Sequence, residues 1–307
     1  MGEDRGMESS VRRIGITGAS GGIGGRVARL LEAAGAGPRL RLIVRDAARA
    51  PQIAGAEVAV ATYSDGPAAR AALEGVDVLL MVSAAENADR LAEHRSFVEA
   101  ARASGVGHVV YTSFFGAAPD ATFTLARDHF VTENLIRDAG LGHTFLRDNL
   151  YTDFLPMLAG EDGVIRGPAG TGRVASVTRD DVAECAVAAL LAPDAHAGAT
   201  YELTGPEALT LGEVAAIVSD ERGAAQAGNP DAAVGSAAPV TFHDESLDEA
   251  YASRAVYGAP DWQVDAWVST YTAIAAGELA RVTDDVRRLT GHAPRSLRDF
   301  LRAESGA

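Results

Sequence analysis

The chain has 307 residues, of which 47% are hydrophobic and 22% charged, a balance typical of a folded globular protein. Its 42 acidic and 27 basic residues give a formal net charge of -15, which disfavours nucleic acid and anionic membrane surfaces as partners because both carry negative phosphates. Every basic residue is arginine, so no amine side chain can serve as an acid, a base or a Schiff-base former.

The N-terminal segment MGEDRGMESS is acidic and has no apolar stretch, which argues against a signal peptide. No run approaches the ~20 apolar residues of a membrane helix. The single cysteine, Cys185, excludes an internal disulfide, and its apolar surroundings VAECAVAALLA favour buried packing over nucleophilic work. These features predict a cytoplasmic protein with no membrane association.

The first half of the chain alternates short apolar runs with alanine-rich helical stretches that end at glycine. Strict alternation with short connections predicts an α/β fold, a doubly wound parallel sheet with helices on both faces. The expected strands, each buried on both faces, are 12–17, 39–44, 57–62, 77–83, 108–113 and 143–147, and the expected helices between them are 24–35, 66–75, 90–105 and 127–140.

The alternation breaks after Arg147. Glycine-rich turns follow in GEDGVIRGPAGTG, then a helix near 179–192, a strand at 200–204 and a helical tail. Residues 223–238, GAAQAGNPDAAVGSAA, have low complexity and few apolar anchors, which predicts a flexible surface loop.

The strongest chemical signal is ITGASGGIGG at residues 16–25, where Gly18, Gly21 and Gly24 have the spacing GxxGxxG between a strand and a helix. Glycine permits the sharp turn and a close approach to a pyrophosphate, and the helix N-terminus offers unpaired N–H donors to the anion. The alternative is a glycine-rich turn with no cofactor. The position directly after the first strand favours a dinucleotide site.

The second strand ends at IVRDAARA, where dinucleotide folds contact the adenosine ribose. Arg45 can pair with a 2′-phosphate and Arg49 lies one helical turn later, whereas Asp46 could accept from a free ribose hydroxyl and favour NAD. A third interpretation makes Asp46 the cap of a solvated helix. We expect NADP(H), and no metal site.

Several segments together carry a family resemblance: TGASGGIG, VRDAARA, HRSFVEAARASGVGHVVYTS, LARDHFVTENLIRDAGLGHTFLRDNLYTDF, ASVTRDDVAECA and TYELTGPEALTLGEVAAIV. In this order the chain resembles the NmrA-like branch of atypical short-chain dehydrogenases, and within it the NADPH-dependent quinone oxidoreductases. The resemblance implies a Rossmann-type NAD(P)-binding domain over residues 11–150, completed by segments within 172–205. A smaller C-terminal substrate-binding lobe would cover 151–307, with the substrate cleft between the two.

The resemblance also implies roles for individual residues. The pyrophosphate would be held by the glycine-rich segment and the 2′-phosphate by Arg45, with Tyr63 and Asp65 near adenine. Small residues after the fourth and fifth strands would border the nicotinamide, although each could equally be a strand-end cap. Asn149 and Tyr151 would face the nicotinamide and substrate, or else cap the following helix. The full set is Gly18, Ser20, Gly21, Ile23, Gly24, Arg45, Tyr63, Asp65, Ser83, Ala84, Ala85, Thr112, Ser113 and Phe114 for the cofactor, and His129, Glu133, Asn149 and Tyr151 for catalysis.

The chain departs from the superfamily at the catalytic Tyr-x-x-x-Lys pair. Aligned on Glu133, the tyrosine position is Leu125 and the lysine position is His129. This loss counts against ordinary ketones and less against quinones, because a quinol oxygen is far less basic than an alkoxide. Since His129 and Glu133 share a helix face, Glu133 is expected to orient the imidazole and keep its pKa near neutrality; the alternative is a histidine with no function on a helix surface.

These observations predict an NADPH-dependent oxidoreductase that transfers a hydride to a quinone-like acceptor. Two alternatives remain open, an NADP(H)-binding redox sensor without turnover and a biosynthetic carbonyl or ene reductase. The aromatics Phe114, Phe115, Phe123, Tyr151 and Phe154 could line a flat pocket or simply pack in the core. The expected partner is a small molecule, and a homodimer is a possible assembly.

Overall fold

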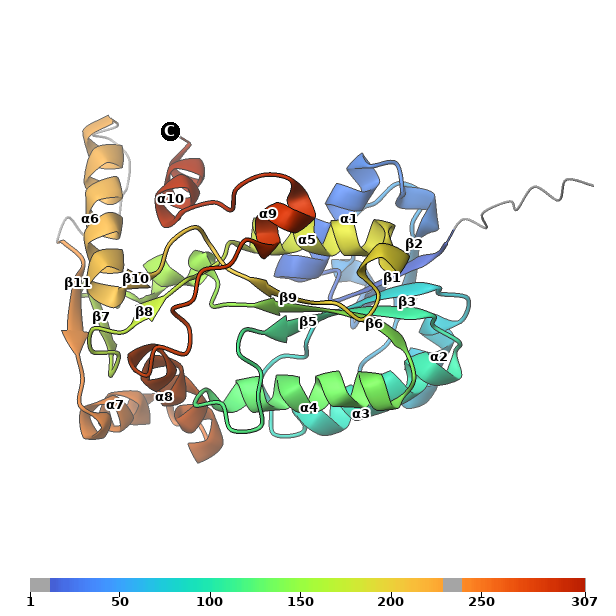
Figure 1. Cartoon of the computed structure of the whole chain (residues 1–307), viewed down its shortest axis with the longest axis horizontal. Coiled ribbons are helices and arrows are strands. Elements are labelled where there is room, and N and C mark those ends of the chain that lie inside the picture. The colour runs from blue at the N-terminus through green and yellow to red at the C-terminus, as the bar shows by residue number, and fades with distance from the viewer. Residues whose placement is uncertain (1–11, 229–238, 307) are drawn as a thin grey trace, which may run out of the picture.

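A seven-stranded parallel sheet forms the centre of the molecule in the computed structural model, which describes residues 12–228 and 239–306 (Figure 1). Every neighbouring pair of its strands is parallel. In spatial order the strands are β3 (Glu57–Val60), β2 (Leu40–Val44), β1 (Ile14–Thr17), β4 (Val78–Met81), β5 (His108–Phe114), β6 (Gly142–Asp148) and β9 (Thr200–Leu203). The expected doubly wound fold is confirmed, and β1 and β4 form the switch point at which the strand order reverses.

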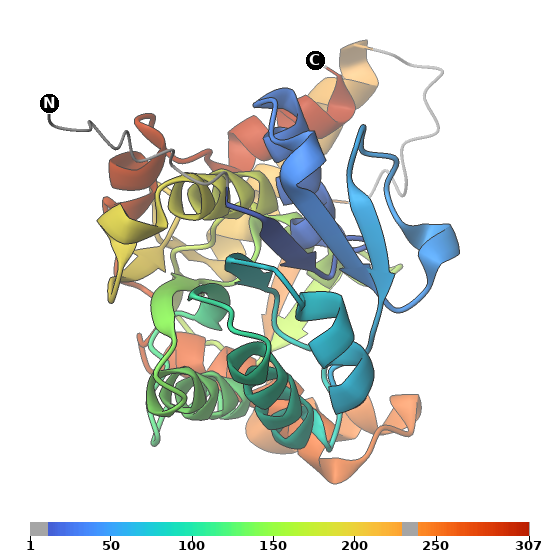
Figure 2. The ribbon, with the colours of Figure 1, turned by 90° about the vertical axis from the view of Figure 1, so that its right-hand side faces the viewer.

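Helices cover both faces of this sheet, as Figure 1 and the view at right angles in Figure 2 show. One face carries α1 (Gly22–Ala33), α5 (Arg179–Leu191) and α9 (Asp285–Thr290), and the other carries α2 (Gly66–Leu73), α3 (Arg90–Ala103) and α4 (Thr124–Asp138). The helices predicted at 24–35 and 127–140 begin two and three residues earlier than expected, at Gly22 and Thr124. Short 3₁₀ turns occupy η1 (Gly37–Arg39), η2 (Ala47–Arg49) and η4 (Pro193–His196).

The remaining elements form a lobe beyond the carboxyl ends of the strands, on the left of Figure 1. Its two-stranded sheets pair β7 with β11 and β8 with β10. The elements are η3 (Thr152–Leu158), β7 (Val164–Gly167), β8 (Arg173–Val174), β10 (Leu209–Thr210), α6 (Leu211–Gly228), β11 (Thr241–Asp244), α7 (Leu247–Arg254), η5 (Ala255–Tyr257), α8 (Asp261–Ala275) and α10 (Leu297–Ser305).

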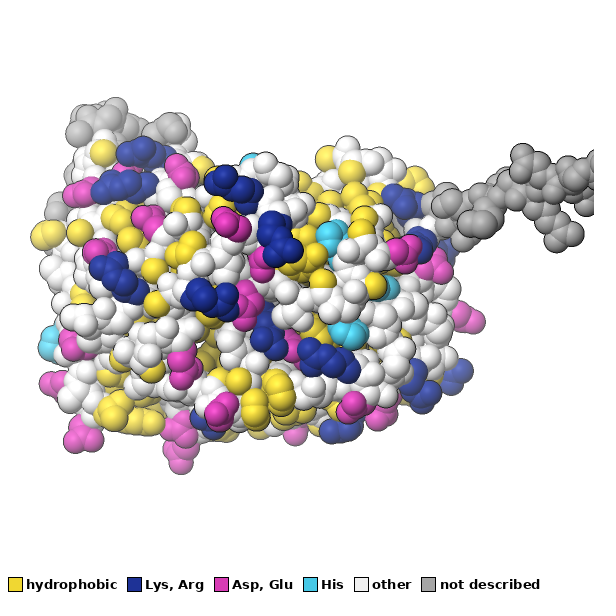
Figure 3. Space-filling model, viewed as in Figure 1, with side chains coloured by type: hydrophobic (Ala, Val, Ile, Leu, Met, Phe, Trp, Pro, Cys, Tyr) yellow, Lys and Arg dark blue, Asp and Glu magenta, His cyan; other side chains and the backbone are white. Residues whose placement is uncertain are grey.

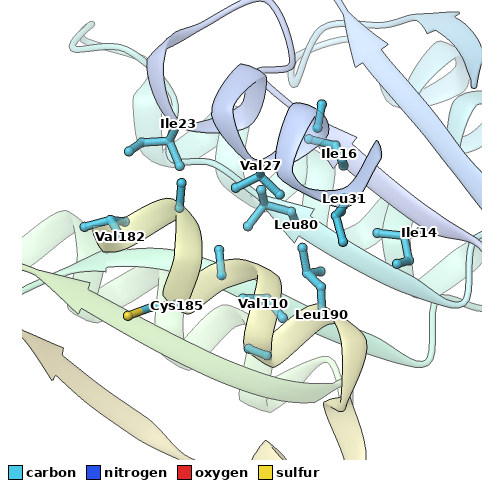
Figure 4. Close-up of a cluster of buried hydrophobic side chains, with 14 of the residues drawn as sticks. Ile14, Ile16, Ile23, Val27, Leu31, Leu80, Val110, Val182, Cys185 and Leu190 are labelled. Carbon is cyan, nitrogen blue, oxygen red and sulfur yellow. The ribbon is translucent and has the colours of Figure 1, made fainter. Parts of the chain in front are cut away.

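Apolar side chains between α1, α5 and the sheet form the largest core cluster (Figure 4). Val27 and Leu31 of α1 belong to this cluster, and so does Cys185, which has no exposed surface. The expectation that Cys185 is a packing residue is confirmed, and burial raises the pKa of its thiol, which keeps the side chain unreactive.

Two expectations about local structure are wrong. Strand β3 is not buried on both faces, because it is the edge of the sheet and leaves Val58 and Val60 46% and 54% exposed. The loop expected at 223–238 begins as helix, since residues 223–228 are the end of α6, where the alanine-rich run has high helix propensity. Residues 229–238 lie outside the described part of the chain.

Charged side chains of both signs alternate over the face shown in Figure 3. Arg173 pairs with Glu213 across α6 and β8, and Arg295 pairs with Glu184 of α5. No helix within residues 12–228 and 239–306 is long and apolar enough to span a membrane.

Candidate active site

The glycine-rich turn between β1 and α1 lies at the switch point of the sheet. Gly18 has a φ of +61°, and a Cβ on Gly24 would lie 2.5 Å from the Gly18 carbonyl oxygen, so both positions require glycine. Helix α1 begins at Gly22, and its N-cap residue Gly21 offers no side-chain cap; the first turn has no acidic residue. Its first N–H groups and its positive dipole end are therefore free for an anion, which fits a dinucleotide pyrophosphate.

The other two residues assigned to the pyrophosphate have different surroundings. Ser20 is exposed at the turn. The side chain of Ile23 is buried in the core cluster, where Figure 4 shows it beside Val182 of α5. Only the backbone N–H of Ile23 can serve the cofactor, and its side chain anchors the helix start.

At the end of β2, Arg45 and Arg49 are both exposed, and neither has an ion pair with any residue that the structure describes. Asp46 accepts a hydrogen bond from the backbone N–H of Ala48 at 2.9 Å and caps η2. The carboxylate is therefore engaged in its own turn, which leaves the two guanidinium groups as the free charges beside the adenosine ribose position.

Tyr63 and Asp65, expected near adenine, both have structural partners. The phenol of Tyr63 donates to the Val82 carbonyl oxygen at 2.5 Å and lies 2.6 Å from Thr17 Oγ1, so it joins the ends of β1 and β4. Asp65 caps α2 by accepting from the Ala68 N–H at 3.1 Å. Contact of either residue with adenine stays a prediction.

The chain after β4, which contains Ser83, Ala84 and Ala85, is held in place by side chains of neighbouring elements. Thr112 Oγ1 accepts from the Ser83 N–H at 2.9 Å. His94 Nε2 accepts from the Ala84 N–H at 2.9 Å, and Arg90 Nε donates to the Ala84 carbonyl at 3.1 Å. The strand-end interpretation therefore describes Thr112 correctly, and contact of Ser83, Ala84 and Ala85 with the nicotinamide stays a prediction.

Glu133 is fully buried on α4 and does not orient His129. It accepts from Ser113 Oγ at 2.7 Å and from Arg147 Nε and Nη2 at 2.8 and 2.7 Å. Arg137 lies 3.3 Å from the same carboxylate. The expectation that Glu133 tunes the imidazole is wrong, because these partners use both carboxylate oxygens and turn Glu133 into a structural ion-pair residue.

His129 is instead held by Tyr111 and Arg90. Its Nε2 lies 3.0 Å from Arg90 Nη2, and its Nδ1 lies 2.9 Å from the Tyr111 hydroxyl. A guanidinium can only donate, so Nε2 accepts and Nδ1 carries the proton. Burial, reinforced by the charge of Arg90, lowers the pKa of His129 well below its ordinary value, so the expectation of a pKa near neutrality is also wrong.

His94 shows the same arrangement. Because the Ala84 N–H donates to Nε2, the proton lies on Nδ1 and is donated to Thr132 Oγ1 at 2.8 Å. Burial lowers its pKa to about 3. The two histidines and Arg90 thus form a buried polar network that holds the loop after β4 in place. This structural role was not apparent from the sequence.

Asn149 does not face a cavity. It is 1% exposed, its Nδ2 donates to the Leu279 carbonyl at 3.0 Å, and its Oδ1 accepts from the Leu150 N–H. The expectation that Asn149 faces the nicotinamide and substrate is wrong, because its amide ties the end of β6 to the C-terminal segment.

Tyr151 lines a pocket of about 740 Å³ between the strand ends and the C-terminal lobe. The walls are mostly apolar and come from η3, α7, η5 and α8. Of the aromatics expected to line a pocket, Phe114 and Phe115 are core residues, while three others do line it. The aromatic lining consists of Phe123, Tyr151, Phe154, Tyr257, Trp267 and Tyr271.

Arg179, the first residue of α5, connects this pocket with the glycine-rich turn. Its guanidinium lies 4.2 Å from the ring centre of Phe154 and 5.0 Å from that of Tyr151. A Cβ on Gly22 would lie 3.4 Å from its Cδ and 3.5 Å from its Nε. Sequence reasoning missed Arg179 as a site residue, although Thr178 and Asp181 mark the helix start that places it there.

A doubly wound parallel sheet with an uncapped glycine-rich helix start at its switch point, next to an apolar pocket, defines a dinucleotide-dependent protein of the Rossmann class. A family model described as NAD(P)H-binding matches residues 18–193, and the chain belongs to this family. The family expected from the sequence is thereby confirmed.

Relatives with named activities match over nearly the whole chain. Quinone oxidoreductase 2 of Escherichia coli (strain K12) is 33% identical over 293 residues, covering 94% of this chain and 97% of the relative. The NAD(P)H azoreductase of Xenophilus azovorans is 31% identical, covering 95% and 98%. The crystal structure of an NADPH-dependent quinone oxidoreductase of Escherichia coli complexed with NADPH has a TM-score of 0.82 and 32% identity, covering 95% of this chain and 99% of that one.

Proposed function

We propose that the protein is an NADPH-dependent oxidoreductase that transfers a hydride to a quinone or a similar electrophilic carbonyl acceptor. The observation that supports this most strongly is the position of a large aromatic-lined pocket next to the glycine-rich turn. A flat conjugated acceptor suits such walls, because aromatic rings stack on one another in offset or tilted geometry. The named activities of the full-length relatives agree with this class of acceptor.

Two arginines divide the recognition of the cofactor in this proposal. Arg45 contacts the 2′-phosphate, which makes the preference NADPH over NADH, and Arg179 contacts the pyrophosphate beside Gly22. When bound, the cofactor supplies the hydride. Tyr151 faces the acceptor, and the rest of the pocket excludes water from it.

The first experiment measures NADPH oxidation by the purified protein with a panel of quinones, followed at the nicotinamide absorbance. Steady oxidation is expected. Cofactor binding without oxidation by any acceptor would favour the redox sensor, and oxidation confined to non-quinone carbonyl or alkene acceptors would favour the biosynthetic reductase.

The second experiment separates the two arginines by binding. Arg45→Ala removes a charge-assisted contact of roughly 1.5 to 3 kcal/mol, so NADPH should bind about ten- to a hundredfold more weakly while NADH affinity is kept. Arg179→Ala should weaken NADPH and NADH equally. Arg102→Ala, an exposed arginine at the end of α3, is the matched control. If Arg45→Ala leaves NADPH affinity unchanged, or the wild type prefers NADH, the cofactor assignment is wrong.

A further inference from the structure

Asp148, the last residue of β6, differs from the other buried carboxylate residues of the described chain. It is 4% exposed, and none of the ion pairs formed between described residues includes it. A buried carboxylate normally requires a positive partner, because the ionised form loses its hydration. The other buried carboxylates have arginine partners, which are Arg147 for Glu133, Arg295 for Asp181 and Arg254 for Glu245.

The hydrogen-bond partner of Asp148 is the phenol of Tyr151. The Tyr151 hydroxyl donates to Asp148 Oδ2 at 2.6 Å. The charged and titratable groups around the pair are Arg179, which stacks on the tyrosine ring, Asp153, which lies near Arg179, and Tyr111 of β5. Burial outweighs the hydrogen bond and the charge of Arg179 and raises the pKa of Asp148 to about 8, so its carboxyl is protonated at neutral pH.

A protonated Asp148 changes what Tyr151 can do. A carboxylic acid has an O–H of its own, which can donate to the Tyr151 oxygen. The phenol hydrogen is then no longer committed to Asp148, and Tyr151 is one of the residues that line the pocket. With an ionised Asp148, the phenol hydrogen stays committed to the carboxylate.

Neither a lysine nor the two buried histidines near this site can supply the proton. The chain has no lysine. His129 accepts from a guanidinium at Nε2 and uses its only proton toward Tyr111, and His94 uses its proton toward Thr132. The pair at the end of β6 therefore offers a proton next to the pocket that neither histidine can supply.

We propose that Tyr151 and Asp148 form the acid pair of this enzyme, in which Tyr151 gives its proton to the acceptor oxygen and Asp148 replaces it. This inference rests on the proposed reductase function. An acceptor that has received a hydride carries two additional electrons and a negative charge on oxygen. The Tyr151 O–H bond breaks as the acceptor O–H bond forms, the Asp148 proton passes to the tyrosine oxygen, and the carboxylate takes a proton from water before the next turnover.

The test compares Asp148→Asn and Tyr151→Phe with wild type between pH 5 and 9, using a soluble benzoquinone as acceptor. Wild-type turnover should decline above about pH 8, as Asp148 ionises. Tyr151→Phe should lower kcat about ten- to a hundredfold with the KM for NADPH kept. Asp148→Asn should lower kcat about tenfold and abolish the alkaline decline, and the double variant should be no slower than Tyr151→Phe. The matched control is Asp138→Asn, an exposed carboxylate on α4, which should behave as wild type.

A second readout does not need turnover. At pH 7 the infrared spectrum of the wild type should contain the carbonyl band of a buried protonated carboxylic acid, which is absent in Asp148→Asn and present in Asp138→Asn. Absence of this band in the wild type, or an Asp148→Asn variant with wild-type kcat and an unchanged alkaline decline, would overturn the acid pair. A wild type that shows the band but oxidises no NADPH with any quinone overturns the proposed function instead, and the acid pair as a catalytic device with it.

Discussion

The ionisation state of Asp148 makes a prediction about folding stability that is independent of any activity. Its pKa of about 8 lies well above the ~3.9 of an aspartate in an unfolded chain. Between these two values the native state keeps a proton that the unfolded state has lost, so stability falls as pH rises, by about 1.4 kcal/mol per pH unit. This loss of folding stability is absent below pH 4 and reaches roughly 5 kcal/mol near pH 8.

Asp148→Asn removes this cost because the amide cannot ionise, but its second N–H is left without a partner in a buried place, at about 1 to 3 kcal/mol. The variant should therefore gain stability relative to wild type as the pH rises, and it should be the more stable of the two at pH 8. Urea unfolding followed by circular dichroism at pH 5, 6, 7 and 8, without cofactor, measures the difference, which should rise by ~1.4 kcal/mol per unit. Asp138→Asn should show a flat difference. A flat difference for Asp148→Asn as well would mean that its carboxyl titrates normally, and the reasoning from burial would be refuted.

Other predictions follow from neighbouring features. Glu133→Gln should destabilise the fold by about 3 to 5 kcal/mol in thermal or urea unfolding, because Arg147 is left without its buried partner; a loss under 1 kcal/mol would contradict a structural ion pair. Gly24→Ala should greatly weaken cofactor binding in a fluorescence titration, since its Cβ meets the Gly18 carbonyl at 2.5 Å, and unchanged binding would exclude this turn as the cofactor site. His129→Asn should leave the shape of the pH–rate profile unchanged between pH 5 and 8, as the imidazole stays neutral there; loss of an ionisation near pH 6.5 would contradict a neutral imidazole. The pure protein should show no sequence-selective DNA binding in gel shifts, given its net charge of -15.

The fold and the cofactor turn were predictable from the sequence because both depend on local patterns. The spacing of Gly18, Gly21 and Gly24 reports a backbone constraint that only glycine satisfies, and the order of strands and helices restricts the topology. The edge position of β3 was not predictable from its apolar composition, since exposure of Val58 and Val60 depends on which strands pair beside them.

The catalytic assignments failed where the partner of a side chain comes from a distant segment. The i, i+4 spacing of His129 and Glu133 suggested an interaction. Instead, His129 bonds to Tyr111, and Glu133 bonds to Ser113 and Arg147. Asp148 was passed over for the adjacent Asn149. Only the three-dimensional arrangement shows which of the two is bonded to the pocket-lining Tyr151.

The route of the chain between the sheet and the C-terminal lobe limits how the pocket can open. After the lobe helix α8, the segment returns to the sheet layer, where Asn149 binds the Leu279 carbonyl and Asp285 accepts from the Glu202 N–H of β9. A hinge motion needs chain connections between the two parts whose backbone can rotate freely. Here the returning segment is hydrogen-bonded to the ends of the strands. Access for a bulky acceptor then depends on the pocket-wall segments η3 and η5, whose Met157 and Tyr257 are 71% and 72% exposed. Truncating the chain between sheet and lobe would remove part of the sheet layer together with part of the lobe.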